Sequence, residues 1–167
     1  RGMPLTSLGL SGTQVTDLRD LKDMPLTSLY VSGLKVKDLS PLKGMKLTAL
    51  FVDGPLVSDL RPIEGMPIRI LYLRGCSNIK DLSPLKGSPV VYLCLSGCSG
   101  LKDLTPLAEC KELAALTIPT QFKGKAIEFL RDLPKLGRLG YEGDPQSNAL
   151  PAEEFWKKHG GAAPVKK

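Results

Sequence analysis

Five aspartates that recur at one position of a repeated phrase are the first side chains in this sequence that could carry chemistry. Carboxylates gathered in this way could act as paired acids and bases or could hold a metal ion. Each one, however, is followed by a leucine and a short turn-like stretch, as in Asp38-Leu-Ser-Pro-Leu. This recurrence favours a capping role, in which each carboxylate accepts backbone N–H groups at the start of a helical turn. The five are Asp17, Asp38, Asp59, Asp81 and Asp103.

The four cysteines form no C-x-x-C pair. Cys76 and Cys98 occupy the same repeat position one turn apart, which would separate their Cα atoms by about 4.8 Å, within the range of a disulfide. Their side chains would point in parallel rather than toward each other, so we expect reduced thiols packed inside the turns. Cys110 is expected in or near the core. The cysteine spacing, with Cys94 included, matches no common zinc site.

The one histidine, His159, lies near the end of the chain, where no Ser-His-Asp or Cys-His arrangement has a scaffold. The sequence also has no glycine-rich phosphate loop. We therefore predict that the chain is not an enzyme and has no catalytic, metal-binding or cofactor-binding residues.

A repeated phrase of 21 or 22 residues must position all of these side chains. Versions of Met-Pro-Leu-Thr-Ser-Leu start at residues 3, 24, 45, 66 and 88. A fixed period in the twenties built on L-x-x-L-x-L is typical of leucine-rich repeats. The sequence therefore predicts an α/β leucine-rich-repeat solenoid (horseshoe). It would have a parallel concave sheet, short 3₁₀ turns on the convex side and a C-terminal helical cap.

Aliphatic residues fill every inward position of the repeats. One turn cannot bury them, but stacked turns bury them against each other, each worth roughly 1.5–3 kcal/mol. The return legs, such as Asp38-Leu-Ser-Pro-Leu, have only about five residues and predict a single 3₁₀ turn each. In the first repeat the inward residues are Leu5, Leu8, Leu10, Val15, Leu18 and Leu21.

The Asp-Leu-Ser-Pro-Leu return leg on this period resembles internalin-type bacterial leucine-rich repeats. The near-identical Met-Pro-Leu-Thr-Ser-Leu and Ser-Pro-Leu-Lys-Gly phrases resemble repeat arrays of planctomycete-type bacteria, over about residues 2–118. The resemblance implies a sensing or docking module of a larger bacterial protein, such as a kinase. The chain departs from internalins at the asparagine of L-x-x-N, so no asparagine ladder is expected. The residues there are Thr13, Leu34, Pro55, Cys76 and Cys98.

The chain divides into three parts. Residues 1–118 hold five regular leucine-rich repeats and the start of a sixth, residues 119–158 form a last irregular repeat and the C-terminal cap, and residues 159–167 are expected to be a mobile tail. Because Arg1 is not a methionine and leads at once into repeat sequence, we expect a segment of a longer polypeptide.

Two helices and a strand are expected in the second part. Spacing of apolar residues predicts a convex helix over Lys123–Leu133, longer than the earlier turns. Leu139 would lie in the last of about seven strands. Pro151–Lys158 reads as a helix with Pro first, acids early and lysines late, in keeping with the helix dipole. Its Phe155 and Trp156 would close the end of the core.

The net charge of +6 is a mild basic bias. Lysine columns such as Lys37, Lys80 and Lys102 could touch phosphate, but the aspartate column runs beside them and offsets their field. A solvated face is favoured, so we predict no nucleic-acid partner. No apolar run approaches the roughly 18 residues that a membrane span needs, and no signal peptide is recognisable, so membrane insertion is not expected.

Aromatic side chains gather at outward strand positions in the middle turns. By alternation, Tyr30, Phe51, Tyr72, Cys94 and Thr117 share one column, while Ile70, Tyr92 and Ala115 share the next. Contiguous exposed aromatics suggest a protein-binding site. The alternative is that the rings stack for stability alone, as cross-strand pairs do. A third outward column contains Asp53, Arg74, Ser96 and Pro119, of which Asp53 and Arg74 would set polar specificity.

The favoured function is therefore non-catalytic binding of a protein or peptide on the concave face. The predicted binding residues are Tyr30, Phe51, Asp53, Ile70, Tyr72, Arg74 and Tyr92. The alternative is a structural spacer or assembly element that self-associates through an uncapped N-terminal repeat, an edge where a neighbouring domain could also dock.

Overall fold

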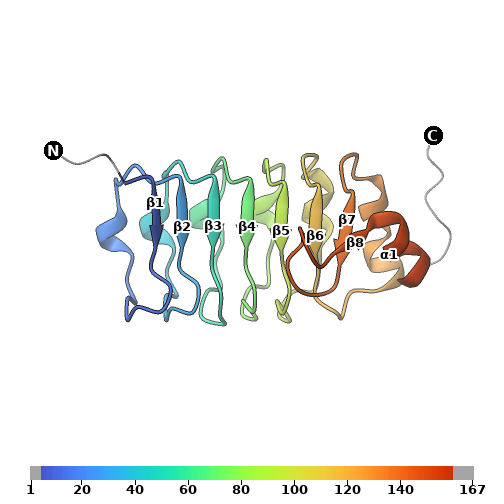
Figure 1. The fold of residues 1–167 in the computed structure, drawn as a ribbon, viewed down its shortest axis with the longest axis horizontal. Coiled ribbons are helices and arrows are strands. Elements are labelled where there is room, and N and C mark those ends of the chain that lie inside the picture. The colour runs from blue at the N-terminus through green and yellow to red at the C-terminus, as the bar shows by residue number, and fades with distance from the viewer. Residues whose placement is uncertain (1–4, 160–167) are drawn as a thin grey trace.

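Eight short strands form one sheet along the length of the molecule, in the same order as in the chain (Figure 1). The computed structural model describes residues 5–159. Strands β1 to β7 are parallel to their neighbours, as predicted, and an eighth strand pairs antiparallel with β7. The strands are β1 (Ser7–Gly9), β2 (Ser28–Tyr30), β3 (Ala49–Phe51), β4 (Ile70–Tyr72), β5 (Tyr92–Cys94), β6 (Ala115–Thr117), β7 (Arg138–Gly140) and β8 (Leu150–Pro151).

The repeat period sets the register of the parallel strands. The central leucine of each strand pairs with the central leucine of the next, in one unbroken column from Leu8 to Leu139. Because neighbouring strands lie about 4.8 Å apart, residues at one repeat position lie directly above one another. Residues that share one repeat position in the sequence therefore form a continuous row across the sheet.

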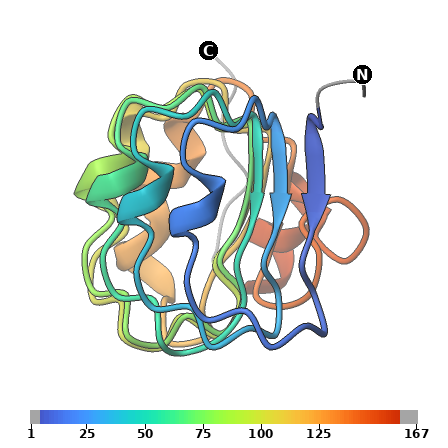
Figure 2. The ribbon, with the colours of Figure 1, turned by 90° about the vertical axis from the view of Figure 1, so that its left-hand side faces the viewer.

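Short 3₁₀ helices form the opposite, convex side, one to each turn (Figure 2). The first four have three residues each, as the short return legs predict. The convex helix expected over Lys123–Leu133 is present as η6, but it too is a 3₁₀ helix. A 3₁₀ helix rises about 2.0 Å per residue, against 1.5 Å in an α-helix. The nine residues of η6 therefore span a longer stretch of the convex side than nine residues of an α-helix would. The helices are η1 (Arg19–Leu21), η2 (Ser40–Leu42), η3 (Arg61–Ile63), η4 (Ser83–Leu85), η5 (Thr105–Glu109) and η6 (Gly124–Asp132).

Each aspartate of the column accepts a backbone N–H at the start of its turn, as predicted, although it lies one residue before the N-cap leucine. Asp38 Oδ1 accepts the Ser40 backbone N–H at 2.8 Å, and Asp38 Oδ2 accepts the Ser40 hydroxyl at 2.8 Å. The other four aspartates accept the equivalent backbone N–H at 2.8–2.9 Å. These hydrogen bonds favour the charged carboxylate and so lower the pKa of each carboxyl group. The largest effect comes from the donors of the residue two positions after each aspartate.

The core runs through the solenoid between the sheet and the 3₁₀ helices. All 24 inward positions of repeats two to five are at most 4% exposed. In the first repeat Leu18 and Leu21 are buried, whereas Leu5 is 47% exposed and Leu8, Leu10 and Val15 are half-buried. This gradient arises because β1 pairs on one side only among the described residues.

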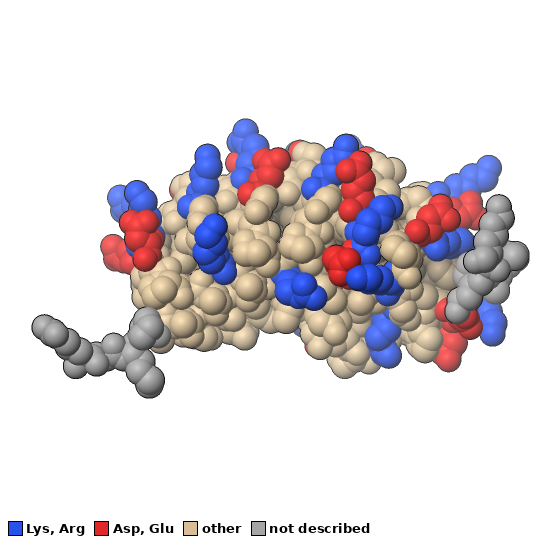
Figure 3. Space-filling view, turned by 90° about the horizontal axis from the view of Figure 1, so that it is seen from above, with Lys and Arg blue, Asp and Glu red and all other residues tan. Residues whose placement is uncertain are grey.

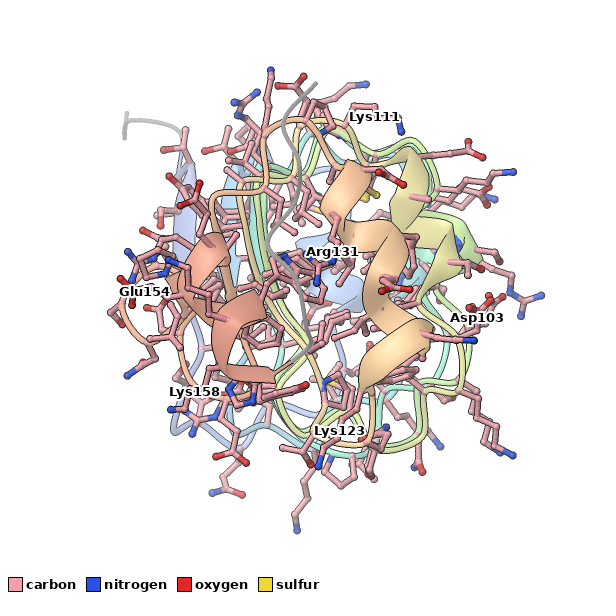
Figure 4. All side chains as sticks on the ribbon, turned by 90° about the vertical axis from the view of Figure 1, so that its right-hand side faces the viewer. Asp103, Lys111, Lys123, Arg131, Glu154 and Lys158 are labelled. Atoms are coloured by element: carbon pink, nitrogen blue, oxygen red, sulfur yellow. The ribbon has the colours of Figure 1, made fainter. Side chains whose placement is uncertain are left out.

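A small aromatic cluster closes the C-terminal end of the core. It is built on α1 (Ala152–His159), which starts one residue after Pro151, and Phe155 and Trp156 are buried as predicted. The Arg131 guanidinium of η6 lies over the Trp156 ring at 4.2 Å from its centroid, in the space between η6 and α1 (Figure 4). His159 belongs to α1 and packs on Phe155 rather than starting the expected tail; residues 160–167 lie outside the described part.

Candidate functional site

Three aromatic rings stack along the outer surface of the sheet, which we call the concave face. The Tyr30 and Phe51 ring centroids are 4.5 Å apart with an interplanar angle of 14°, and those of Phe51 and Tyr72 are 4.7 Å apart at 29°. The register makes this ladder, because the three residues are paired neighbours on β2, β3 and β4. The strand spacing of about 4.8 Å is close to a ring-stacking distance.

A groove with a volume of about 390 Å³ runs beside this ladder on the concave face. It brings together four of the seven residues predicted to bind protein, namely Tyr30, Phe51, Ile70 and Tyr92. Tyr30 is 38% exposed, and the other three are half-buried. The remaining lining residues are Ser28, Thr48, Ala49, Arg69 and Val91. The groove is thus largely apolar and open, with Arg69 as the one charged residue in its lining.

The other three predicted binding residues do not line the groove. Asp53 is half-buried and Arg74 is exposed, in the column on the far side of the ladder. Tyr72 is half-buried, and its hydroxyl donates a 2.7 Å hydrogen bond to Asp144 Oδ1. Burial and the neighbouring Asp144 carboxylate raise the pKa of Tyr72 well above its usual value.

A loop between β7 and β8 covers the C-terminal half of the concave face. We call residues 142–148 the strap; Figures 1 and 2 show the strap's loop outside the sheet, over β5 and β6. The Gly143 carbonyl accepts hydrogen bonds from Cys94 Sγ at 3.4 Å, Ser96 Oγ at 3.3 Å and Thr117 Oγ1 at 3.3 Å. The strap therefore continues the concave face as a wall beyond Tyr72.

The strap corrects the prediction that the outward columns face solvent in the last turns. Cys94, Ser96, Ala115, Thr117 and Pro119 are all buried. Alternation along a strand decides which side of the sheet a residue faces, but it does not reveal what covers that side. One signal was visible in two of the columns, where the aromatic Tyr72 and Tyr92 are followed by the smaller Cys94 and Ala115 at the place where the strap lies.

Arg69 is the one charged residue among the five groove-lining residues that were not predicted to bind; the others are Ser28, Thr48, Ala49 and Val91. It precedes β4 by one residue, in the column of Thr27 and Thr48, whose hydroxyls donate to carbonyl groups of the previous turn. A search one position beyond the alternating strand residues would have found it, because the groove extends past the strand ends.

Charged side chains of both signs are interleaved along the edge of the solenoid that Figure 3 views from above. Exposed pairs such as Lys86–Glu109, with N–O distances of 3.0 Å, link adjacent turns. Within residues 5–159, no three His, Cys, Asp or Glu side chains are grouped to hold a metal ion. Among the same residues, no helix is long and apolar enough to cross a membrane.

Comparison with known proteins places the fold. No protein-family profile matches the chain, and no curated protein matches its sequence. Among solved structures, the chain is similar to internalin C2 of Listeria monocytogenes, with a TM-score of 0.69 and 27% identity over 81% of this chain. It is also similar to the internalin InlF of the same organism, with a TM-score of 0.70 and 29% identity over 82% of this chain.

The chain has an internalin-like leucine-rich-repeat fold. It spans 61% of the length of the internalin C2 chain and 41% of that of InlF. The planctomycete-type resemblance of the repeats remains a prediction.

This internalin-like solenoid uses cysteines at two of the positions where an asparagine ladder would run. Cys98 Sγ donates to the Leu73 carbonyl of the previous turn at 2.9 Å, and Cys76 Sγ donates to the Val52 carbonyl at 3.7 Å. Burial raises the pKa of both thiols to about 12. All four cysteines are buried and none is joined in a disulfide in this structure, and Cys110 lies in the core, as predicted.

Proposed function

We propose that this chain is a non-catalytic module that binds a protein or peptide segment in the groove on its concave face. The observation that carries the proposal is the open groove of about 390 Å³ lined by Tyr30, Phe51, Ile70 and Tyr92. Aromatic side chains in such a recess supply large contact areas with few rotatable bonds, which is why they dominate protein-binding hot spots.

Stacking alone does not account for this surface. The ladder satisfies the ring faces of Tyr30 and Phe51, but Ile70 and Tyr92 lie in a separate column and leave an apolar wall open to solvent. If these side chains served stability alone, a surface that buried them completely would serve equally well. The half-exposed apolar wall therefore favours a partner over a purely structural role.

The groove chemistry favours a ligand segment with one apolar or aromatic anchor beside a carboxylate. The anchor would lie against Ile70 and Phe51, and the carboxylate would pair with the guanidinium of Arg69. Asp53 and Arg74, on the other side of the ladder, would contact only a ligand that crosses the rings. They are proposed to add specificity rather than affinity.

A random peptide library displayed on phage would test this proposal without knowledge of the natural partner. The native chain should enrich peptides with an aromatic or aliphatic residue near an acid, and a Tyr30→Ser, Ile70→Ser variant should lose them. Leu56→Ser is the matched control, because Leu56 is 44% exposed and outside the groove. Circular dichroism and urea unfolding would show that each variant is folded. Peptides that bind all three baits equally would place the site elsewhere.

Self-association through the N-terminal edge is a second candidate, supported by the exposure of the first repeat. Leu5 is 47% exposed there, and β1 has a free pairing edge among the described residues. Sedimentation of the native chain against a Leu5→Glu variant would test it. A concentration-dependent dimer that the variant loses would support assembly, and a monomer at high concentration would remove it.

A further inference from the structure

The strap is far longer than its topology requires. Because β7 and β8 are antiparallel neighbours with Leu139 opposite Leu150, a two-residue turn could join them one step further on. The chain instead runs out over β5 and β6 and returns, and this excursion adds no strand or helix. The contacts that the strap makes with the sheet should therefore explain its length.

Polar contacts attach the strap to the sheet. The Gly143 carbonyl is shared by Cys94, Ser96 and Thr117, and Asp144 accepts from Tyr72. Pro145 is buried, while Glu142 and residues 146–148 are exposed. Segments with little buried apolar area and few anchoring bonds open at much lower free energy than the core. The strap belongs to this class, whereas the turns below it are held by buried aliphatic side chains.

The tip of the strap is also a preformed unit. The Asn148 backbone N–H donates to the Asp144 carbonyl at 2.8 Å, the Asp144 N–H donates to Asn148 Oδ1 at 3.0 Å, and the Gln146 N–H donates to Asp144 Oδ1 at 2.7 Å. The tip therefore presents one carbonyl and one carboxylate to the sheet in a turn that its own bonds define. It resembles a small docked ligand more than a connecting segment.

The sheet beneath it offers a matching set of donors. The phenol of Tyr72, the thiol of Cys94 and the hydroxyls of Ser96 and Thr117 all donate to the strap. Ser96 and Thr117 are 5% and 0% exposed, and Ser96 Oγ can also donate to Thr117 Oγ1 at 3.2 Å, so the pair together requires one acceptor from above, which the Gly143 carbonyl supplies. Their chemistry selects an acceptor-rich turn, namely a backbone carbonyl followed by an Asp or Glu side chain.

We propose that Tyr72, Cys94, Ser96 and Thr117 form a recognition site for an acidic turn, and that the strap is its resident, displaceable occupant. A partner turn with the same carbonyl and carboxylate would replace the strap and extend the contact surface from the aromatic ladder across β5 and β6. This inference concerns the covered half of the concave face and does not depend on the groove binding a ligand.

Cys94 provides a reporter of strap opening in the full chain. Its thiol is 1% exposed and lies under the Gly143 carbonyl, while Cys76, Cys98 and Cys110 lie in the core. Under native conditions iodoacetamide should alkylate Cys94 at least about tenfold faster than the other three, because only the strap must open. Peptide mass spectrometry would give the four rates in one sample. Equal rates for Cys94 and Cys98 would overturn the proposal, because the strap would then open only when the solenoid unfolds.

A matched pair of strap variants sharpens the test. Asp144→Ala removes the acceptor of both the Tyr72 hydroxyl and the Gln146 N–H and should raise the Cys94 rate severalfold, while the other three rates stay constant. Glu142→Ala removes an exposed acid from the same strap and should leave all four rates unchanged. An equal effect of the two substitutions would overturn the role assigned to Asp144.

The recognition step is tested with the strap supplied as a separate peptide. The receiving protein has residues 142–148 replaced by an equal length of Gly and Ser, and the probe is the synthetic peptide Glu-Gly-Asp-Pro-Gln-Ser-Asn. At millimolar concentration the peptide should slow alkylation of Cys94, and the same peptide with Ala for Asp should not. Alkylation unaffected by either peptide would show that the covered surface is no recognition site, whether or not the groove binds a ligand.

Discussion

The hydroxyl of Tyr72 donates a 2.7 Å hydrogen bond to Asp144 Oδ1 across 72 residues of sequence. This bond joins the last ring of the aromatic ladder to the strap, so one residue belongs to both halves of the concave face. The ring of Tyr72 stacks on Phe51, and its hydroxyl anchors the loop that covers β5 and β6. A change at Tyr72 therefore acts on both surfaces, and removal of the hydroxyl alone separates the two effects.

A double-mutant cycle with Tyr72→Phe and Asp144→Ala should give a coupling energy of about 1 kcal/mol, the usual net worth of one partly buried hydrogen bond. Each single change should lower the free energy of unfolding in urea, and Asp144→Ala should lower it more because it also removes the acceptor of the Gln146 N–H. The double variant should lose little more than Asp144→Ala alone. Tyr30→Phe is the control, because Tyr30 is exposed and it is the hydroxyl of Tyr72, not that of Tyr30, that donates to Asp144. Purely additive losses at Tyr72 and Asp144 would show that the two side chains are not energetically coupled.

The ladder predicts an order of costs among its rings. Phe51 stacks on two neighbours and Tyr30 on one, and each such pair is worth about 0.5–1.5 kcal/mol beyond buried area. Phe51→Ala should therefore destabilise the protein by about 1 kcal/mol or more beyond Tyr30→Ala, as measured by urea unfolding. Equal costs would mean that the stacking adds no stability, and the rings would then be explained by binding alone.

The sequence predicts the columns of this molecule well because a single period sets them. Once Leu29, Leu50 and Leu71 are aligned, the parallel register follows, and it places Tyr30 on Phe51 and Ile70 beside Tyr92. The groove is a direct consequence of that register. Four of its members, Tyr30, Phe51, Ile70 and Tyr92, could be named from the sequence because each lies directly beside the central leucine of its strand.

The strap lies beyond the reach of the same reasoning. Gly143 contacts Cys94 across 49 residues, and no periodic signal connects them. The antiparallel β8 that returns the chain has two residues, too short for a pattern to form. Tyr72 was therefore assigned to an open surface although its hydroxyl is engaged by Asp144. Contacts that depend on the conformation of one loop are decided by packing, so they cannot be predicted from the period of the repeats.

The aspartate column predicts loss of stability in acid. The native pKa of each of these carboxyls lies below the usual 3.8, because each accepts the N–H two residues on. A group with a lowered native pKa stabilises the fold above its unfolded pKa, and that stability is lost as pH falls through the native value. The free energy of unfolding should therefore decline below about pH 4, and less steeply in an Asp38→Ala, Asp81→Ala variant.

Asn is the informative control at these positions. Asp38→Asn keeps an oxygen that can accept the Ser40 N–H, so its urea midpoint should lie between those of the native chain and Asp38→Ala. An Asn variant as weak as the Ala variant would show that the carboxylate charge, rather than the hydrogen bond, stabilises the turn.

The buried thiols predict a second loss of stability, at alkaline pH. Burial raises the native pKa of Cys76 and Cys98 from 9.0 to about 12, so the native state keeps protons that the unfolded chain releases. Above pH 9 the free energy of unfolding should therefore fall, with each thiol contributing up to about 1.4 kcal/mol per pH unit. Urea unfolding of the native chain between pH 7 and pH 10.5 measures the fall, and Cys76→Ala, Cys98→Ala should flatten it. A slope that survives this double substitution would assign the alkaline loss to other groups, with Cys110 the first to examine because burial raises the pKa of its thiol as well.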